Sequence, residues 1–223
     1  MNKILALLMA LLTTFQVFAE DDPNDYRVLV TKTDGTVFVG YNNTRFTNYF
    51  RPKVKTVSIS AEYKGEPTKY TGEEVKRVEF VNLTGDSVPV IFEAVNAQSM
   101  LGHKWNKDPK PYDTPIFLRL IYEGENIKGY VMPYLDQTLT PSMNVMNYTW
   151  RYFYLTKDSD VAVAYWNGTN DIIPAVKKVM KFYFREFPAV MEKVDKGELK
   201  AKDFRKNPAM VLPLMDKTYK SKE

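Results

Sequence analysis

Strand-turn-strand patterns follow one another along most of the chain, and they restrict it to folds built around an antiparallel sheet. In the clearest case, RVLVTK (residues 27–32) and TVFVGY (36–41) alternate apolar and polar residues on either side of Asp34-Gly35. A two-residue Asp-Gly turn between alternating segments is typical of a β-hairpin. Further strands are expected at residues 54–63, 74–81, 88–95, 116–123, 127–134, 147–156 and 161–166. Because no helical period separates these segments, residues 26–166 are predicted to form a mainly antiparallel sheet, sandwich or barrel.

The sequence changes to a helical period after Asn167-Gly168. In VKKVMKFYFREFPAVMEKV (176–194), a step of 100° per residue gathers apolar residues into one arc of roughly 140°. The arc contains Val176, Val179, Met180, Tyr183, Phe184, Phe187, Val190, Met191 and Val194. Packing on the sheet is favoured over partner binding or membrane contact, and Phe182 is the large apolar residue outside the arc. Pro188 either kinks the helix or starts a second one, and Gly197 ends it.

The two patterns together predict an α+β fold with strands first and helices last. We expect a β-rich domain at residues 20–168 and a helical segment at residues 169–223 that packs on it. Two long connections, residues 96–115 and 135–146, are expected to be loops. The chain has no cysteine, so the domain must be held together by its core and not by disulfides.

The first 19 residues have the pattern of a secretory signal peptide. Lys3 precedes the apolar run ILALLMALL (4–12), and small residues precede the expected cleavage point after Ala19. The run is far shorter than the roughly 20 residues that span a bilayer, and no later segment is long and apolar enough. We therefore expect no transmembrane segment and an exported protein, periplasmic or secreted. Without a cysteine, a lipid anchor after the signal is excluded.

Catalytic and cofactor motifs are missing. His103 is the only histidine and cysteine is absent, which leaves too few ligands for a zinc site and no setting for a catalytic triad. Neither a phosphate-binding glycine loop nor a GxSxG motif occurs. No catalytic residue, metal or cofactor is therefore predicted. One enzymatic alternative stays open, because glycoside hydrolysis needs only two carboxylates. The acids expected on strands are Glu62, Glu79, Glu93 and Glu123.

Aromatic residues are the best candidates for ligand contact. Trp105 and Tyr112 lie in a loop rich in Pro and Lys, where exposure is expected, so they are the first to consider. Trp150, Tyr152 and Tyr154 alternate along one expected strand and share a face. That face could stack on sugar rings, but core packing is favoured because aromatic cross-strand pairs stabilise sheets.

Charge is distributed unevenly along the chain. Residues 174–223 carry 13 Lys and Arg against 7 Asp and Glu, whereas the rest of the mature chain is slightly acidic. The helical segment is therefore the favoured surface for an anionic partner. Glu186 and Glu192 interrupt its positive face, which argues against nucleic acid as a partner and against membrane contact.

Four segments together resemble a group of exported proteins of unassigned function that are common in Bacteroidetes genomes. They are DGTVFVGY (34–41), KYTGEEVKRVEF (69–80), IFLRLIYEGENIKGY (116–130) and KFYFREFPAVMEKVDKGEL (181–199). The resemblance implies an envelope or secreted bacterial protein with strands before helices, and it brings no catalytic residues. We expect a non-enzymatic exported protein that binds a protein or glycan partner. The alternative is a carboxylate-based hydrolase that acts on polysaccharide or peptidoglycan.

Overall fold

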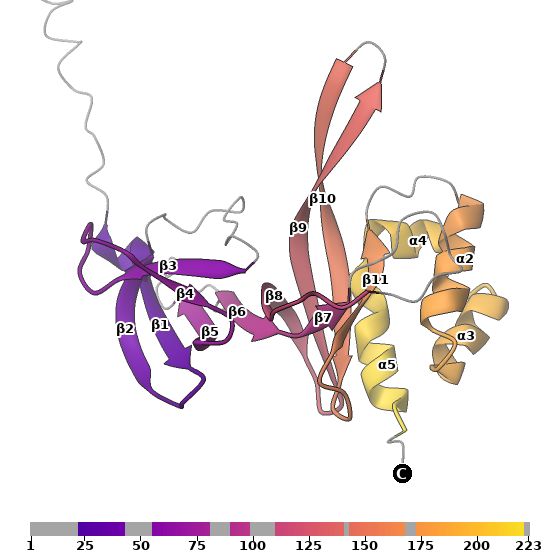
Figure 1. Cartoon of the computed structure of the whole chain (residues 1–223). Coiled ribbons are helices and arrows are strands. Elements are labelled where there is room, and N and C mark those ends of the chain that lie inside the picture. The colour runs from indigo at the N-terminus through magenta and orange to yellow at the C-terminus, as the bar shows by residue number, and fades with distance from the viewer. Residues whose placement is uncertain are drawn as a thin grey trace, which may run out of the picture.

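A single open sheet runs through the described part of the molecule. The computed structural model describes residues 22–42, 55–80, 90–98, 110–140, 143–167 and 173–220. Eleven strands in these residues form one sheet in the order β4-β3-β2-β1-β5-β6-β8-β9-β10-β11-β7 (Figure 1). All neighbouring strands are antiparallel except β11 and β7. The strands are β1 (Arg27–Lys32), β2 (Val37–Asn42), β3 (Thr56–Ser60), β4 (Thr68–Thr71), β5 (Val75–Phe80), β6 (Val90–Val95), β7 (Ala97–Gln98), β8 (Ile116–Glu123), β9 (Ile127–Thr140), β10 (Met143–Thr156) and β11 (Ala162–Asn167).

Short helices follow the sheet, which confirms the predicted α+β class. They are α2 (Ile173–Tyr183), α3 (Pro188–Asp195), α4 (Ala201–Lys206), the 3₁₀ turn η2 (Pro208–Val211) and α5 (Leu212–Thr218). One further 3₁₀ turn, η1 (Pro23–Tyr26), precedes β1. In the described residues, none of the helices has the length and apolar character needed to cross a membrane.

The predicted Asp-Gly hairpin joins β1 and β2. Gly35 has a φ of +87°, a left-handed conformation that glycine adopts without a steric penalty. The carboxylate of Asp34 accepts a hydrogen bond from the N–H of Thr36 at 2.8 Å. That bond lowers the pKa of Asp34 below its ordinary value. The turn therefore fixes the register in which Val30 lies opposite Phe38.

Three clusters of buried side chains follow the sheet from one end to the other. The first lies on β1 to β6 and includes Val28, Val30 and Phe92. The second lies on one face of β8 to β11 and includes Phe153. The third lies on the opposite face of β9 to β11, under the helices, and includes Tyr165. Phe153 and Tyr154 of β10 therefore enter different clusters, as the alternation of a strand requires. On β11, Tyr165 and Trp166 both enter the third cluster, because the register with β10 shifts at this point.

The helices cover their face of the sheet as the periodicity predicts. Val176, Met180, Phe184 and Val190 of the apolar arc are fully buried. Pro188 starts α3 as a second helix, since proline is tolerated in the first turn where no N–H is needed. Phe182, outside the arc, still packs at the rim of the helical cluster, and the guanidinium of Arg185 lies over its ring at 5.1 Å.

The loop expected at residues 135–146 is the main error of the sequence prediction. Strands β9 and β10 instead continue as a hairpin whose last recorded pair is Thr140 and Met143. Beyond Met132 this hairpin pairs with neither β8 nor β11, and it projects from the body of the molecule (Figure 1). Pro133 lies inside the strand expected at residues 127–134, although proline cannot donate to a ladder. It is tolerated here because β9 has become an edge strand at that point.

Residues 96–115 were also expected to be a loop, and the described part contains short pairing. β7 pairs with β11, and Gln98 forms an isolated bridge with Pro111. Residues 99–109, with His103 and Trp105, lie outside the described residues. The expected signal peptide at residues 1–19 lies outside them as well.

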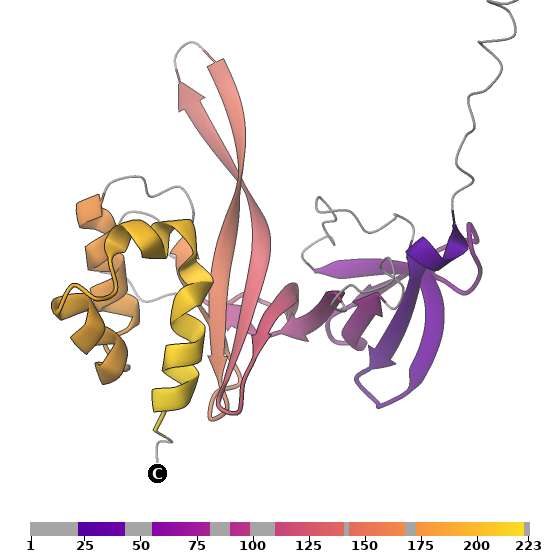
Figure 2. The ribbon, with the colours of Figure 1, turned by 180° about the vertical axis from the view of Figure 1, so that it is seen from behind.

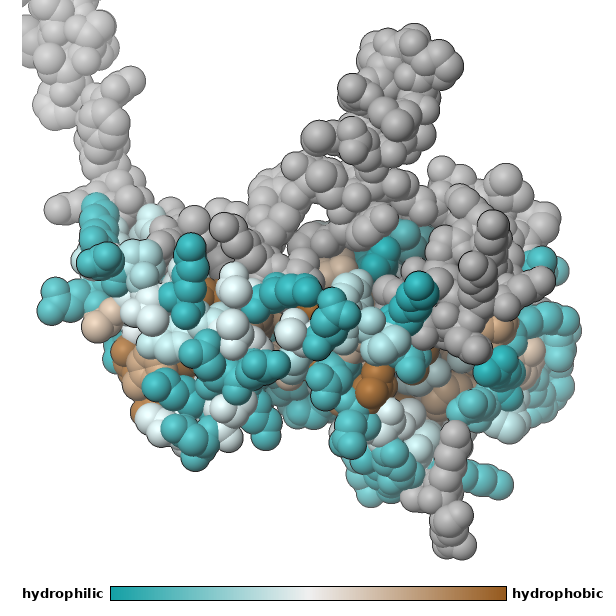
Figure 3. All heavy atoms as spheres, viewed as in Figure 1, coloured by the Kyte–Doolittle hydropathy of each residue, from teal (hydrophilic) through white to brown (hydrophobic). Residues whose placement is uncertain are grey.

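The surface of the described residues is mostly hydrophilic on the face seen in Figure 3. Apolar colour appears over the β1–β2 hairpin, where Val37 and Val39 are exposed. The view from behind shows α5 along the base of the β9–β10 hairpin, as in the first view (Figure 2). α5 thus connects the helical layer to the root of the projecting hairpin.

Candidate functional site

Tyr112, one of the two residues predicted to contact a ligand, is half-buried. Its ring packs against the cluster that contains Phe153, and its N–H donates to the carbonyl of Ala97 at 2.9 Å. Its hydroxyl accepts a hydrogen bond from Nη1 of Arg151 at 3.0 Å. Tyr112 therefore attaches residues 110–116 to the sheet. Trp105 lies outside the described residues, so the structure does not place the two aromatics together.

The strand aromatics divide between core and surface. Tyr154 is buried, and Tyr152 is half-buried against Tyr165 with ring centroids 6.3 Å apart. Their packing agrees with the predicted core role. Trp150 on the same strand keeps 39% of its surface exposed. The three residues do not form one continuous exposed platform.

Three of the four acids expected on strands, Glu79, Glu93 and Glu123, form ion pairs with Arg77 or Lys128. Glu93 accepts from Nη1 of Arg77 at 3.2 Å, from Nζ of Lys128 at 3.2 Å and from the Tyr130 hydroxyl at 2.7 Å. Burial alone would lower the pKa of Lys128, but the carboxylates of Glu123 and Glu93 outweigh it and raise that pKa. Burial, followed by the Glu93 carboxylate, raises the pKa of the Tyr130 hydroxyl. These groups form a charge network across β5, β6, β8 and β9.

The other strand acids do not provide a catalytic pair either. Glu79 lies 3.2 Å from Nη2 of Arg77, and Glu123 lies 3.0 Å from Nζ of Lys128. Glu62 is exposed after β3. Glu79, Glu93 and Glu123 are therefore held in ion pairs and are not arranged as a catalytic pair.

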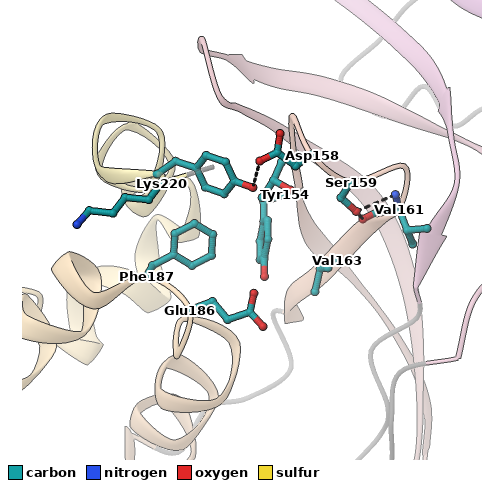
Figure 4. Close-up of a pocket in the computed structure, with 10 residues that line it drawn as sticks. Tyr154, Asp158, Ser159, Val161, Val163, Glu186, Phe187 and Lys220 are labelled. Carbon is teal, nitrogen blue, oxygen red and sulfur yellow. Dashed lines mark hydrogen bonds between the residues drawn. The ribbon is translucent and has the colours of Figure 1, made fainter. Parts of the chain in front are cut away.

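A cleft of 330 Å³ lies where the sheet meets the helices. Its lining comes from three parts of the chain that are distant in sequence (Figure 4). The end of β10, the following turn and β11 supply one wall. The junction between α2 and α3 and the residues after α5 supply the other. The lining residues are Tyr154, Thr156, Asp158, Ser159, Val161, Val163, Glu186, Phe187, Tyr219 and Lys220.

Three aromatic rings form the apolar part of the cleft. The rings of Tyr154 and Phe187 meet edge to face, with centroids 5.4 Å apart and planes at 89°. The ring of Tyr219 lies 6.3 Å from that of Phe187. Tyr154 is 8% exposed and Phe187 is 4% exposed, so both are held by the core under the helices. Two of the three aromatic walls are therefore held in place by the core.

Carboxylates and hydroxyls form its polar part. The Tyr219 hydroxyl donates to Oδ2 of Asp158 at 3.0 Å. The side chain of Ser159 is held by two hydrogen bonds to the backbone of Val161, each 3.1 Å long. Figure 4 places the carboxylates of Asp158 and Glu186 toward opposite ends of the Tyr154 side chain. Burial first, and then the Glu186 carboxylate, raises the pKa of Tyr154.

Breaks between helices bring Glu186 and Phe187 to the cleft. α2 ends at Tyr183, and the N–H of Phe187 donates to the carbonyl of Phe184 at 2.9 Å in the turn that follows. Pro188 then restarts the helix, because its ring fixes φ but removes an N–H. The predicted break at Pro188 therefore turns two residues of the helical segment toward the sheet.

The last described helix positions Tyr219. Oδ1 of Asp216 in α5 accepts from the N–H groups of Asn126 at 2.6 Å and Ile127 at 2.9 Å, and Oδ2 accepts from the Tyr122 hydroxyl at 3.1 Å. Partial burial acts to raise the pKa of Asp216, but these hydrogen bonds outweigh it, so the pKa is lowered. The bonds fasten α5 to the β8–β9 turn, and Tyr219 follows directly after the helix.

No local motif indicated this cleft in the sequence. Asp158 lies in the turn between the strands expected at residues 147–156 and 161–166, and Phe187 was predicted as part of the apolar arc, which is confirmed. No role was predicted for Tyr219 from the sequence. In the described residues, no group of three or more His, Asp or Glu side chains is arranged to hold a metal ion.

Comparison with known proteins gives no relative from which a function could be transferred. The chain matches no model of a protein family, no curated protein and no solved structure.

Proposed function

We propose that the chain is an exported, non-enzymatic protein that binds a protein or glycan partner through the cleft between β10–β11 and the helices. One observation carries the binding proposal: three aromatic rings line the same 330 Å³ cleft as carboxylates and hydroxyls. Apolar walls with a few fixed polar groups are the usual composition of ligand sites, whose volumes are about 300–1,000 Å³.

Export is supported by the sequence. The basic, apolar and small-residue order of residues 1–19 is that of a cleaved leader. The resemblance to exported proteins common in Bacteroidetes points the same way. Expression of the full chain in a bacterium should give a periplasmic or secreted form whose N-terminal residue is Glu20. A product that keeps Met1 and stays in the cytoplasm would contradict export.

The carboxylates already have partners within the protein, and this favours binding over hydrolysis. Glu93 and its neighbours are engaged with Arg77 and Lys128, and Asp158 already accepts a hydrogen bond from Tyr219. A hydrolase alternative keeps one observation in its favour, because Asp158 and Glu186 line the same cleft. Two carboxylates on either side of a glycosidic bond are what that reaction requires.

A binding experiment on the mature protein separates these functions. The protein is screened against glycan and peptide arrays, and each ligand found is titrated by calorimetry. Removal of an aromatic wall by Tyr219→Ala should weaken binding about 5- to 30-fold. Tyr70→Ala is the matched control, because Tyr70 is another half-buried tyrosine at the far end of the sheet.

Two results would overturn the proposal. One is binding that Tyr219→Ala leaves unchanged, which would place the ligand elsewhere. The other is release of sugar from polysaccharide or peptidoglycan that Glu186→Gln abolishes, which would establish the hydrolase alternative.

A further inference from the structure

We infer that the ligand group held in this cleft is an organic cation, an alkylammonium group carried by a small molecule or by a lysine side chain. The inference rests on the proposed binding function and narrows its chemistry. Three features of the cleft carry it: the number of rings, the sign of the charges and the size of the space.

The rings provide the first argument. Tyr154, Phe187 and Tyr219 approach the same space from a strand, a helix junction and the segment after α5. The face of an aromatic ring attracts a cation, and cages of several rings are the common means of binding quaternary ammonium groups. The molecule already places its own cations over rings elsewhere. Nζ of Lys32 lies 5.8 Å from the centroids of both Phe38 and Tyr70.

The charges provide the second argument. Asp158 and Glu186 contribute two carboxylates to the lining. Lys220 also lines the cleft, but its amino group points away from the aromatic rings in Figure 4. At the Tyr154 hydroxyl, the Glu186 carboxylate raises the pKa more than Arg185 lowers it. The lining therefore carries two carboxylates against one ammonium group, and this balance favours a cation over a phosphate or carboxylate ligand.

The size of the cleft provides the third argument. Its volume of 330 Å³ is at the lower end of the range for ligand sites, about 300–1,000 Å³. A compact head group such as trimethylammonium is small enough to enter such a space together with part of the chain that carries it. The rings of Tyr154 and Phe187 are held by their neighbours in the core, so both walls are formed before a ligand enters.

The test uses the mature chain and a pair of probes with the same shape. Choline carries a trimethylammonium group, and 3,3-dimethylbutan-1-ol carries an uncharged tert-butyl group in its place. Binding is measured by calorimetry and by chemical-shift changes of the cleft residues. Choline should bind at least about 10-fold more tightly than its neutral counterpart, since only the cation interacts with the rings and carboxylates.

Variants locate the binding. Tyr219→Leu removes one ring and should weaken choline binding about 5- to 30-fold, whereas Tyr219→Phe retains the ring and most of the affinity. Glu186→Gln removes one charge and should weaken it about 3- to 10-fold. Glu66→Gln, the same change at an exposed turn beyond β3, should have no effect. Unfolding temperatures of all variants are measured so that loss of binding is separated from loss of fold.

A second pair of probes distinguishes the source of the cation. A short capped peptide with a central lysine is compared with the same peptide containing norleucine. Binding of choline supports a free ammonium ligand, and binding of the lysine peptide alone supports a protein partner. If neutral sugars or 3,3-dimethylbutan-1-ol bind as tightly as the cations, the inference is wrong and the proposed binding function stands. If arrays and probes all fail to bind, both are wrong.

Discussion

The carboxylate of Asp216 occupies the space where a side chain at Gly124 would have to lie. Gly124 is in the turn between β8 and β9, and its N–H donates to the carbonyl of Ile127 at 2.9 Å. Because the turn has no side chain at this position, α5 can place a carboxylate directly against its backbone. The arrangement joins two segments about 90 residues apart and fixes the start of the segment that carries Tyr219.

Gly124→Ala should disturb this arrangement through a steric clash. The added Cβ would meet the carboxylate of Asp216, and the free energy of unfolding should fall by about 1–3 kcal/mol. Asp216→Ala should cost about 1–3 kcal/mol because the N–H groups of Asn126 and Ile127 lose their acceptor. Urea unfolding of the single and double variants measures the coupling. The double variant should lose clearly less than the two single losses together, and strict additivity would contradict the direct contact.

The lowered pKa of Asp216 makes stability depend on pH in a defined direction. A carboxyl whose folded pKa lies below its unfolded value stabilises the protein fully above the unfolded pKa, near 3.8. That stabilisation is lost as the pH falls through the folded pKa. The difference in unfolding free energy between wild type and Asp216→Asn should therefore be constant from pH 5 to pH 8 and should shrink below about pH 4. A difference that is as large at pH 3 as at pH 7 would show that the charge is not responsible.

Glu93 should matter more for stability than its neighbour Glu79. The Glu93 side chain is 12% exposed and has Arg77, Lys128 and Tyr130 as partners. Glu93→Ala removes the acceptor for all three and should lower the unfolding free energy by about 2–4 kcal/mol. The Glu79 side chain is 23% exposed and meets Arg77, so Glu79→Ala should cost about 1 kcal/mol or less. Guanidinium chloride unfolding of both variants tests the order, and equal losses would contradict a network centred on Glu93.

Tyr165 connects the sheet to η2 through a buried hydrogen bond. Its hydroxyl donates to the carbonyl of Pro208 at 3.0 Å, and burial raises its pKa well above the ordinary value. Tyr165→Phe keeps the ring but leaves that carbonyl without its donor, which should cost about 1–3 kcal/mol. Tyr152→Phe, at a half-buried tyrosine next to it, is the control and should change stability much less. Thermal unfolding of the two variants makes the comparison.

The parts of the fold that local sequence determines could be predicted. The β1–β2 hairpin follows from Asp34-Gly35, because few residue pairs adopt that turn. The helical layer follows from the period of residues 176–194, and the start of α3 follows from Pro188. In each case, the responsible residues lie within one element.

The candidate site could not be predicted in this way. Tyr154, Glu186 and Tyr219 are separated by tens of residues, and each has a plausible packing or surface role of its own. Their convergence depends on how α5 docks, which depends on Gly124 and Asp216. The extension of β9 past Pro133 likewise depends on its pairing with β10. No single residue of β9 determines that pairing.

The β9–β10 hairpin has a mechanical consequence. Each strand has 14 residues and therefore extends roughly 45 Å without interruption. Its root carries Tyr154 in the cleft and Ile127 against Asp216, while its far end stands outside the body. Two paired strands transmit a pull along their axis through covalent backbone. The hairpin joins the wider sheet where Val131 pairs with Arg119 of β8 and Arg151 pairs with Asn167 of β11, so a load at its tip would reach the body of the molecule first at these two pairs.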